Sequence, residues 1–204
     1  IPIFRRTPQA EKTMCLVCVS RLSHMCYLMR TFLIVAQSLD GFITRHDTPG
    51  VDWVAAADQA WFRSCLPEFD AQVMGRVTFE AVRDTLLPRL PDTVFRAVMT
   101  SRPELLEVHS LPGNLEFTAE EPSVILDRFH TANRKSCAIL GGAGVHDAFL
   151  AYGLVDELWV TIEPRIFGEG TPLVRMRHDI QLELIDHRIL ADSQSMLVRY
   201  RVTP

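Results

Sequence analysis

The segment 140–145 (LGGAGV) has the composition of a phosphate-binding turn. It follows a short apolar run and precedes a helical pattern, so its glycines would let a ligand approach the backbone at a helix N-terminus. The free N–H groups and the dipole of a helix give that terminus a partial positive charge. The alternative is a purely structural role, as a tight turn between a strand and a helix. The spacing is not the G-x-G-x-x-G of Rossmann domains, so the segment alone favours a nucleotide only slightly.

Two further segments place phosphate-binding groups directly after an apolar run. Gly75, Arg76 and Thr78 follow one run, and Ser101 with Arg102 follows another. Guanidinium and hydroxyl donors pair well with phosphate oxygens, although a helix-capping Thr and a surface Arg would give the same residues. Because the carboxyl ends of parallel strands meet at one edge of a sheet, the three segments predict a single nucleotide crevice. An extra Arg beside it favours a 2′-phosphate, hence NADPH over NADH.

The elements that must position these groups alternate along the chain. Continuous apolar runs such as 31–36 (TFLIVA) are typical of strands buried on both faces. The alternation of strands with helical patterns predicts an α/β fold with helices on both faces of a mainly parallel sheet, and a C-terminal hairpin adds antiparallel pairing. Strands are expected at 31–36, 71–74, 94–100, 137–140, 158–162, 181–190 and 194–202, and helices at 56–66, from about 75 to 82, at 122–132 and at 145–152.

Bulk properties fit one soluble domain. The chain has 204 residues, 48% of them hydrophobic, with a net charge of −4. It has no basic run, so we expect no nucleic-acid partner. No apolar stretch approaches the roughly 18 residues that cross a bilayer, so we expect no membrane span. An odd number of cysteines without framework spacing predicts reduced thiols and a cytoplasmic location. They are Cys15, Cys18, Cys26, Cys65 and Cys137.

Residues 1–28 show no clean periodicity, and we expect the domain to span 29–204 with the preceding segment as an extension of unassigned role. Cys15, Cys18, His24 and Cys26 imitate part of a zinc site. A second Cys-x2-Cys pair or a helical His pair would be the stronger pattern, so we predict no metal.

The ordered motifs resemble the dihydrofolate reductase superfamily. The resemblance spans about 29–204 and implies a three-layer α/β/α fold and a reductase. The 38–41 (SLDG) and 166–170 (IFGEG) segments are more similar to the riboflavin-pathway branch, the RibD C-terminal domain. The other matching segments are 36–43 (AQSLDGFI), Trp53, 74–80 (MGRVTFE), Gly141-Gly142 and 154–161 (LVDELWVT).

The resemblance implies NADPH as the cofactor and a cis peptide between Gly141 and Gly142. His146 opens the helix after the glycine turn, where it either contacts the nicotinamide or is simply a polar residue at a helix start. The cofactor residues carried over are Gly75, Arg76, Thr78, Ser101, Arg102, Gly141, Gly142, Ala143, Gly144 and Val145.

The resemblance also implies that Asp58 is the pocket acid facing the substrate's amidine edge, with Thr161 as its hydroxyl partner. The alternative for Asp58 is the N-cap of a 59–66 helix. Asp40 is a further catalytic candidate and Glu163 a group that faces the site, but each is also typical of a solvated loop carboxylate. The predicted substrate-binding residues are Ala36, Ser38, Trp53, Phe62 and Glu163.

At two positions the sequence differs from the motifs of the family, and these differences leave the identity of the substrate undecided. Val94 stands where dihydrofolate reductases carry the arginine that clamps the folate tail, with Arg89 and Arg96 only nearby. The segment 84–89 (DTLLPR) only loosely matches the ribose-phosphate loop of the riboflavin branch. We predict an NADPH-dependent reductase, first of a 5-amino-6-(5-phosphoribosylamino)uracil type and second of dihydrofolate or a pteridine. The rival is a non-catalytic nucleotide-binding protein. Exposed edge strands favour a homodimer.

Overall fold

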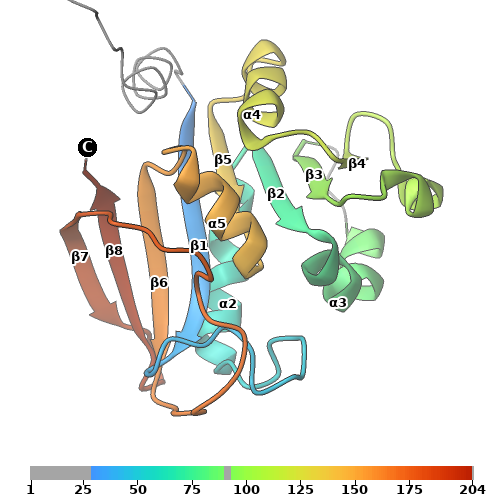
Figure 1. The fold of residues 1–204 in the computed structure, drawn as a ribbon. Coiled ribbons are helices and arrows are strands. Elements are labelled where there is room, and N and C mark those ends of the chain that lie inside the picture. The colour runs from blue at the N-terminus through green and yellow to red at the C-terminus, as the bar shows by residue number, and fades with distance from the viewer. Residues whose placement is uncertain (1–28, 90–92, 204) are drawn as a thin grey trace, which may run out of the picture.

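An eight-stranded sheet runs through the computed structural model, which describes residues 29–89 and 93–203 (Figure 1). The strand order is β4-β3-β2-β5-β1-β6-β8-β7. Strands β1 to β6 all run parallel to one another, whereas β8 runs antiparallel to both β6 and β7. The strands are β1 (Arg30–Ser38), β2 (Ala71–Gly75), β3 (Phe95–Met99), β4 (Leu115–Thr118), β5 (Ser136–Ile139), β6 (Glu157–Glu163), β7 (Leu182–Ile189) and β8 (Met196–Val202).

Helices cover both faces of this sheet. They are α2 (Ala56–Cys65), α3 (Arg76–Leu86), α4 (Pro122–Thr131) and α5 (Ala143–Ala151). Phe129 of α4 and Phe149 of α5 pack with Leu33 of β1 in one apolar cluster. On the opposite face, Cys65 of α2 packs against Phe32 of β1, and α3 packs in a third cluster. The predicted three-layer α/β/α fold of the dihydrofolate reductase type, with a mainly parallel mixed sheet and an antiparallel C-terminal hairpin, is confirmed.

The edge strand β4 is absent from the sequence-based expectation. It is only four residues long, and the side chains of Glu116 and Phe117 in its middle are half-buried. Glu116 forms an ion pair with Arg128 of α4 instead of facing solvent alone. A short strand at a sheet edge lacks both the continuous apolar run and the long alternation that indicate a strand in sequence.

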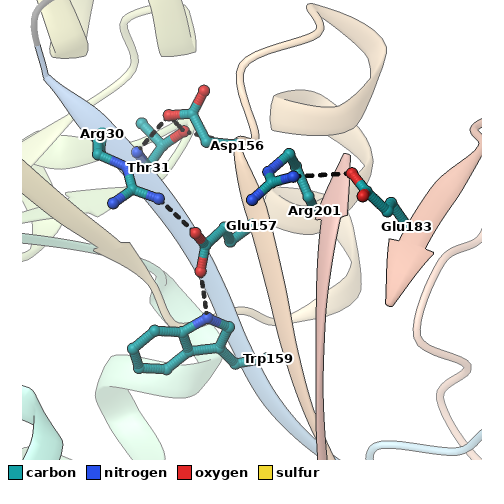
Figure 2. Close-up of polar contacts among 7 residues, drawn as sticks. All are labelled: Arg30, Thr31, Asp156, Glu157, Trp159, Glu183 and Arg201. Carbon is teal, nitrogen blue, oxygen red and sulfur yellow. Dashed lines mark hydrogen bonds and ion pairs between the residues drawn. The ribbon is translucent and has the colours of Figure 1, made fainter. Parts of the chain in front are cut away.

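Polar side chains gather where β1 and β6 begin (Figure 2). Arg30 forms an ion pair with Glu157, which also accepts a hydrogen bond of 2.8 Å from Nε1 of Trp159. The backbone N–H of Thr31 donates to Asp156 at 2.7 Å. We call this group the amino-end network. Its members are Arg30, Thr31, Asp156, Glu157, Trp159, Glu183 and Arg201.

Two further findings bear on the sequence-based expectations. No helix in the ranges 29–89 and 93–203 is long and apolar enough to cross a membrane, and no three metal-ligating side chains gather there. Burial raises the pKa of the Cys65 thiol to about 12, so this thiol stays protonated at neutral pH. Cys15, Cys18, His24 and Cys26 lie outside the described residues.

Candidate active site

A cavity of about 1400 Å³ opens at the carboxyl edge of the central strands and continues between α2 and α3. Its lining comes from segments far apart in the sequence, among them the ends of β1, β2, β3 and β5 and the starts of α3 and α5. Ligand sites in open α/β sheets lie at this edge. The volume lies above the range of about 300–1,000 Å³ that is usual for small-molecule sites, so the cavity has room for an extended ligand or for two ligands together.

Two glycine turns meet at the inner wall of the cavity. Gly75 is the N-cap of α3 and Gly142 the N-cap of α5, and neither helix has a side-chain cap. The backbone N–H of Gly75 donates to the carbonyl oxygen of Gly141 at 2.7 Å. Gly141 has φ +92°, and a Cβ there would lie 2.8 Å from Nε2 of His146, so only glycine fits. The Gly141–Gly142 peptide is cis, which confirms the prediction.

The predicted cofactor residues come together with one exception. Arg102 is exposed and does not contribute to the lining. Arg76 lines the cavity while its guanidinium pairs with Glu80 on the surface of α3 at 2.7 Å. The uncapped N-termini of α3 and α5 therefore lie side by side, where their N–H groups favour an anion. The cofactor candidates in the lining are Gly75, Arg76, Thr78, Ser101, Gly141, Gly142, Ala143, Gly144 and Val145.

Asp58 presents a buried carboxyl group to the cavity. It is the third residue of α2, whose N-cap is Ala55, so the N-cap alternative for Asp58 is wrong. Only 5% of Asp58 is exposed, and its Oδ1 has no hydrogen-bond partner among the described residues. Burial raises the pKa of Asp58 to about 6, against a smaller lowering by the Thr161 hydroxyl, and the nearby charge of Glu163 raises it further.

Thr161 and Glu163 lie behind Asp58 on β6 and do not line the cavity. The Thr161 hydroxyl is fully buried and faces the carboxyl group of Asp58, although it makes no hydrogen bond of good geometry within the described part of the chain. Glu163 accepts hydrogen bonds from the backbone N–H of Ala55 at 3.2 Å and from Oγ of Ser195 at 2.9 Å. Glu163 thus holds the first turn of α2, the helix that carries Asp58.

Asp40 connects two loops beside the cavity. Its carboxylate accepts a hydrogen bond of 2.6 Å from Oγ of Ser38 and bonds from the backbone N–H groups of Phe167 and Gly168. The Ser38 hydrogen bond makes the largest contribution to lowering the pKa of Asp40, so this group is ionised at neutral pH. Neither Asp40 nor Ser38 is part of the cavity lining.

Of the remaining predicted substrate-binding residues, two line the cavity and one does not. Ala36 and Phe62 line the cavity. Trp53 is 2% exposed and does not line it. Its ring meets that of Phe167 edge-on, with the ring centroids 5.1 Å apart, so it supports the loop that follows β6.

His146 touches the cavity from the first turn of α5. Its Nδ1 lies 2.8 Å from the carbonyl oxygen of Leu173. A carbonyl only accepts, so Nδ1 carries the hydrogen and Nε2 of the neutral ring is an acceptor. Burial lowers the pKa of His146, which keeps the ring neutral, and Nε2 has no partner among the described residues.

Arg96 is one of the lining residues that sequence reasoning did not assign to the site. It is the second residue of the otherwise apolar strand β3 and is 3% exposed. Arg96 could have been noticed in the sequence because it is a charged residue within the run 94–99 (VFRAVM). A strand covered by helices on both faces normally has apolar side chains there.

Three comparisons relate this chain to known proteins. A model of the RibD C-terminal domain family matches residues 31–198. The uncharacterized protein YyaP of Bacillus subtilis (strain 168) is 25% identical over 177 residues, which cover 83% of this chain and 93% of YyaP.

Solved structures of two reductases share the fold. A Thermotoga maritima diaminohydroxyphosphoribosylaminopyrimidine deaminase/5-amino-6-(5-phosphoribosylamino)uracil reductase superposes with a TM-score of 0.68 and 17% identity, over 92% of this chain and 60% of that chain. Enterococcus faecalis dihydrofolate reductase complexed with NADP(H) superposes with a TM-score of 0.62 and 20% identity, over 86% of this chain and 97% of that chain.

Proposed function

This chain belongs to the RibD C-terminal domain family, as its motifs predicted, and we propose that it is an NADPH-dependent reductase of a small nitrogen heterocycle. The substrate that we place first is 5-amino-6-(5-phosphoribosylamino)uracil or a close analogue. The observation that carries the proposal is the buried, unpartnered Oδ1 of Asp58 in a cavity that two uncapped helix N-termini also reach. The reductase activity in the name of the Thermotoga maritima protein supports the choice of substrate.

The residues at the glycine turns fit a dinucleotide. The N–H groups at the starts of α3 and α5 have no side-chain cap, so they remain available to phosphate oxygens. Thr78 adds a hydroxyl donor in the same lining, and Ser101 adds another from the end of β3. A bound nicotinamide cofactor supplies the hydride in reductases of this kind.

Asp58 is suited to hold a proton against the substrate. With a pKa of about 6 it is partly protonated near neutral pH, whereas an ordinary aspartate is not. A protonated or hydrogen-bonded ring nitrogen makes the adjacent carbon of a C=N bond more electrophilic. Apolar neighbours such as Phe62 and Ile34 line the same cavity and limit the access of water.

Dihydrofolate or pteridine reduction is the second candidate. It is favoured by Asp58 and Phe62 lying together in the lining, as an amidine-bearing ring would require. A cytoplasmic location and a homodimer stay predictions. For the homodimer, the edge strand β7 presents Leu184 and Ile189 with 52% and 59% of their surface exposed.

The test is titration of the purified protein with NADPH, followed by NADPH oxidation with the aminouracil ribotide and with dihydrofolate. We expect NADPH binding and oxidation with the ribotide. Oxidation with dihydrofolate alone would select the second candidate. An absence of NADPH binding at millimolar concentration would remove the cofactor assignment, and binding without oxidation on either substrate would favour a non-catalytic nucleotide-binding protein.

A further inference from the structure

A buried carboxylate on α5 holds the segment 173–178, which comes after β6 in the chain. Asp147 is only 4% exposed, and its carboxylate accepts hydrogen bonds of 3.1 Å from the backbone N–H groups of Arg175 and Met176. Nε2 of His178 lies 2.9 Å from Oδ1 of the same carboxylate. Burial would raise the pKa of Asp147, but the hydrogen bonds from His178, Met176 and Arg175 lower it, so the group is ionised at neutral pH.

A second contact ties the same segment to α5. Nδ1 of His146 donates to the carbonyl oxygen of Leu173, two residues before Arg175. His146 and Asp147, which are consecutive residues of one helix, therefore fix the backbone on both sides of Arg175. Arg175 itself is exposed and lines the cavity. Its backbone is thus held by buried groups, while its side chain is accessible to a ligand.

The wall of the cavity near Arg175 has space for a ligand group. Gly144 and Ala148 are four residues apart on α5, so they lie on the same face of the helix, and both line the cavity. Asp147, which bonds to the backbone of Arg175, is the neighbour of Ala148. Apart from the helix itself, no heavy atom lies within 4 Å of a Cβ built on Gly144. The uncapped start of α5 therefore faces open space.

The charges at the two glycine turns indicate what Arg175 adds there. A diphosphate carries more negative charge than two helix N-termini can balance, because each terminus supplies only about +0.5 of a charge. Arg76 lines the cavity at the start of α3, but its guanidinium pairs with Glu80 at 2.7 Å. Arg175 lines the same cavity from the side of α5 and brings a full positive charge in a geometry that suits phosphate oxygens.

We propose that Arg175 binds the diphosphate of the nicotinamide cofactor, and that Asp147 is the positioning residue that holds Arg175 at the cavity. The inference rests on the proposed function. It adds a cofactor residue from a segment to which the sequence motifs assigned none. Asp147 then affects cofactor affinity only through Arg175, which distinguishes it from a residue that merely stabilises the fold.

The test measures binding by calorimetry, without substrate and without turnover. NADPH, NADH, adenosine 5′-diphosphate and adenosine are compared on the wild type, Arg175→Gln, Arg175→Lys and Arg177→Gln. Arg177 is an exposed arginine on the same segment and outside the cavity lining, so its variant is the matched control. We expect Arg175→Gln to bind all three diphosphates about ten-fold more weakly than the wild type, because a hydrogen bond to a charged group is lost. Arg175→Lys, which keeps the charge, should recover most of this affinity, and adenosine should bind all variants equally.

A double-mutant cycle tests the positioning role of Asp147. Asparagine keeps the size of the side chain, but its NH2 group cannot accept a hydrogen bond, so Asp147→Asn weakens the anchor of Arg175 and Met176. We expect this variant to lose NADPH affinity by up to the same factor as Arg175→Gln, and the double variant to bind no more weakly than Arg175→Gln alone. Losses that multiply in the double variant would give Asp147 a general structural role and overturn its assignment.

The remaining outcomes separate this inference from the proposed function. Unchanged NADPH affinity in Arg175→Gln would overturn the inference and leave the proposed reductase intact. A loss for NADPH alone, with NADH and adenosine 5′-diphosphate unaffected, would assign the contact to the 2′-phosphate and also overturn it. A wild type that binds adenosine 5′-diphosphate through Arg175 but does not bind NADPH would retain the phosphate site and remove the proposed function. Binding of neither nucleotide would overturn both. Because Arg175 is exposed, its variants decide the first point even if Asp147→Asn does not fold.

Discussion

The two ends of β1 and β6 differ in how their buried polar groups are satisfied. At the amino ends, Glu157 has both Arg30 and the Trp159 indole as partners, and Asp156 holds the backbone of Thr31 (Figure 2). Around the cavity, which opens at the carboxyl edge, Oδ1 of Asp58, Nε2 of His146 and Nε of Arg96 are buried without hydrogen-bond partners in the described part of the chain. A buried polar atom without a partner costs about 1–3 kcal/mol. The amino end therefore contributes stability, whereas the buried polar atoms around the cavity lower it.

The most informative test of this comparison is Asp58→Asn, which we expect to lower kcat/KM by about 10² to 10⁴-fold, because it removes the proton donor while preserving shape. The wild-type kcat/KM should fall as pH rises through about 6, where Asp58 ionises. Steady-state kinetics over a pH series measures both effects. NADPH affinity is the control and should change little. Full activity in the variant would assign the acid role to another group.

Although Asp58→Asn should lose activity, its free energy of unfolding at neutral pH should exceed that of the wild type. The unfolded chain releases the Asp58 proton near pH 3.8 and the folded chain near pH 6, so the folded state binds more protons between these values. The free energy of unfolding of the wild type falls over that window as pH rises, by about 3 kcal/mol. Asp58→Asn lacks this loss. Urea unfolding should show that the free energy of unfolding of Asp58→Asn exceeds that of the wild type by more at about pH 7 than at about pH 4. The same difference at both pH values would contradict a raised pKa of Asp58.

In the amino-end network, Glu157→Ala should reduce the free energy of unfolding by about 1–3 kcal/mol, because the indole N–H of Trp159 loses its acceptor. The change in kcat/KM should stay within about three-fold, since the network is remote from the cavity. Glu157→Gln is the control, because an amide oxygen can still accept from the indole. A large loss of activity in a folded Glu157→Ala variant would contradict the view that the amino-end network affects stability and not activity.

The smallest effect is expected for Arg201→Gln. Arg201 pairs with Glu183 at 2.8 Å, but both side chains are more than half exposed, at 56% and 58%. An exposed pair contributes about 0–1 kcal/mol and is screened by salt. Chemical denaturation in low and high salt checks this, with Arg188→Gln as a variant that breaks no described ion pair.

Local motifs made much of this molecule predictable. The turns at Gly75 and Gly141 lie between an apolar run and a helical pattern, and parallel strands bring such turns to one edge. The sequence-based expectation includes all the strands except β4, whose four residues, two buried and two half-buried, carry too short a pattern. Asp58 was identified by resemblance, although its exact place in α2 required the structure.

The remaining features depend on contacts between residues far apart in the sequence. Glu163 was predicted to face the site, but its partners Ala55 and Ser195 lie 108 and 32 residues away, and no spacing rule identifies such pairs. Asp40 could be recognised as a candidate acid, whereas its bonds to the backbone of 167–168 span a similar separation. Arg96 could not be assigned, because the burial of a charged side chain depends on contacts that only the fold brings together.

The hydrogen bonds of Glu163 also bear on when the site forms during synthesis. Ser195 belongs to the connection between the last two strands, so it leaves the ribosome after every cavity-lining residue. Until that connection docks, the start of α2 lacks one of the contacts that fix it. A nascent chain in which the glycine turns have already formed therefore still lacks the Ser195–Glu163 hydrogen bond, which supports the start of the helix that carries Asp58. Contacts of such long sequence separation form late in folding. The cavity end of the molecule is therefore completed only when the final hairpin closes onto β6.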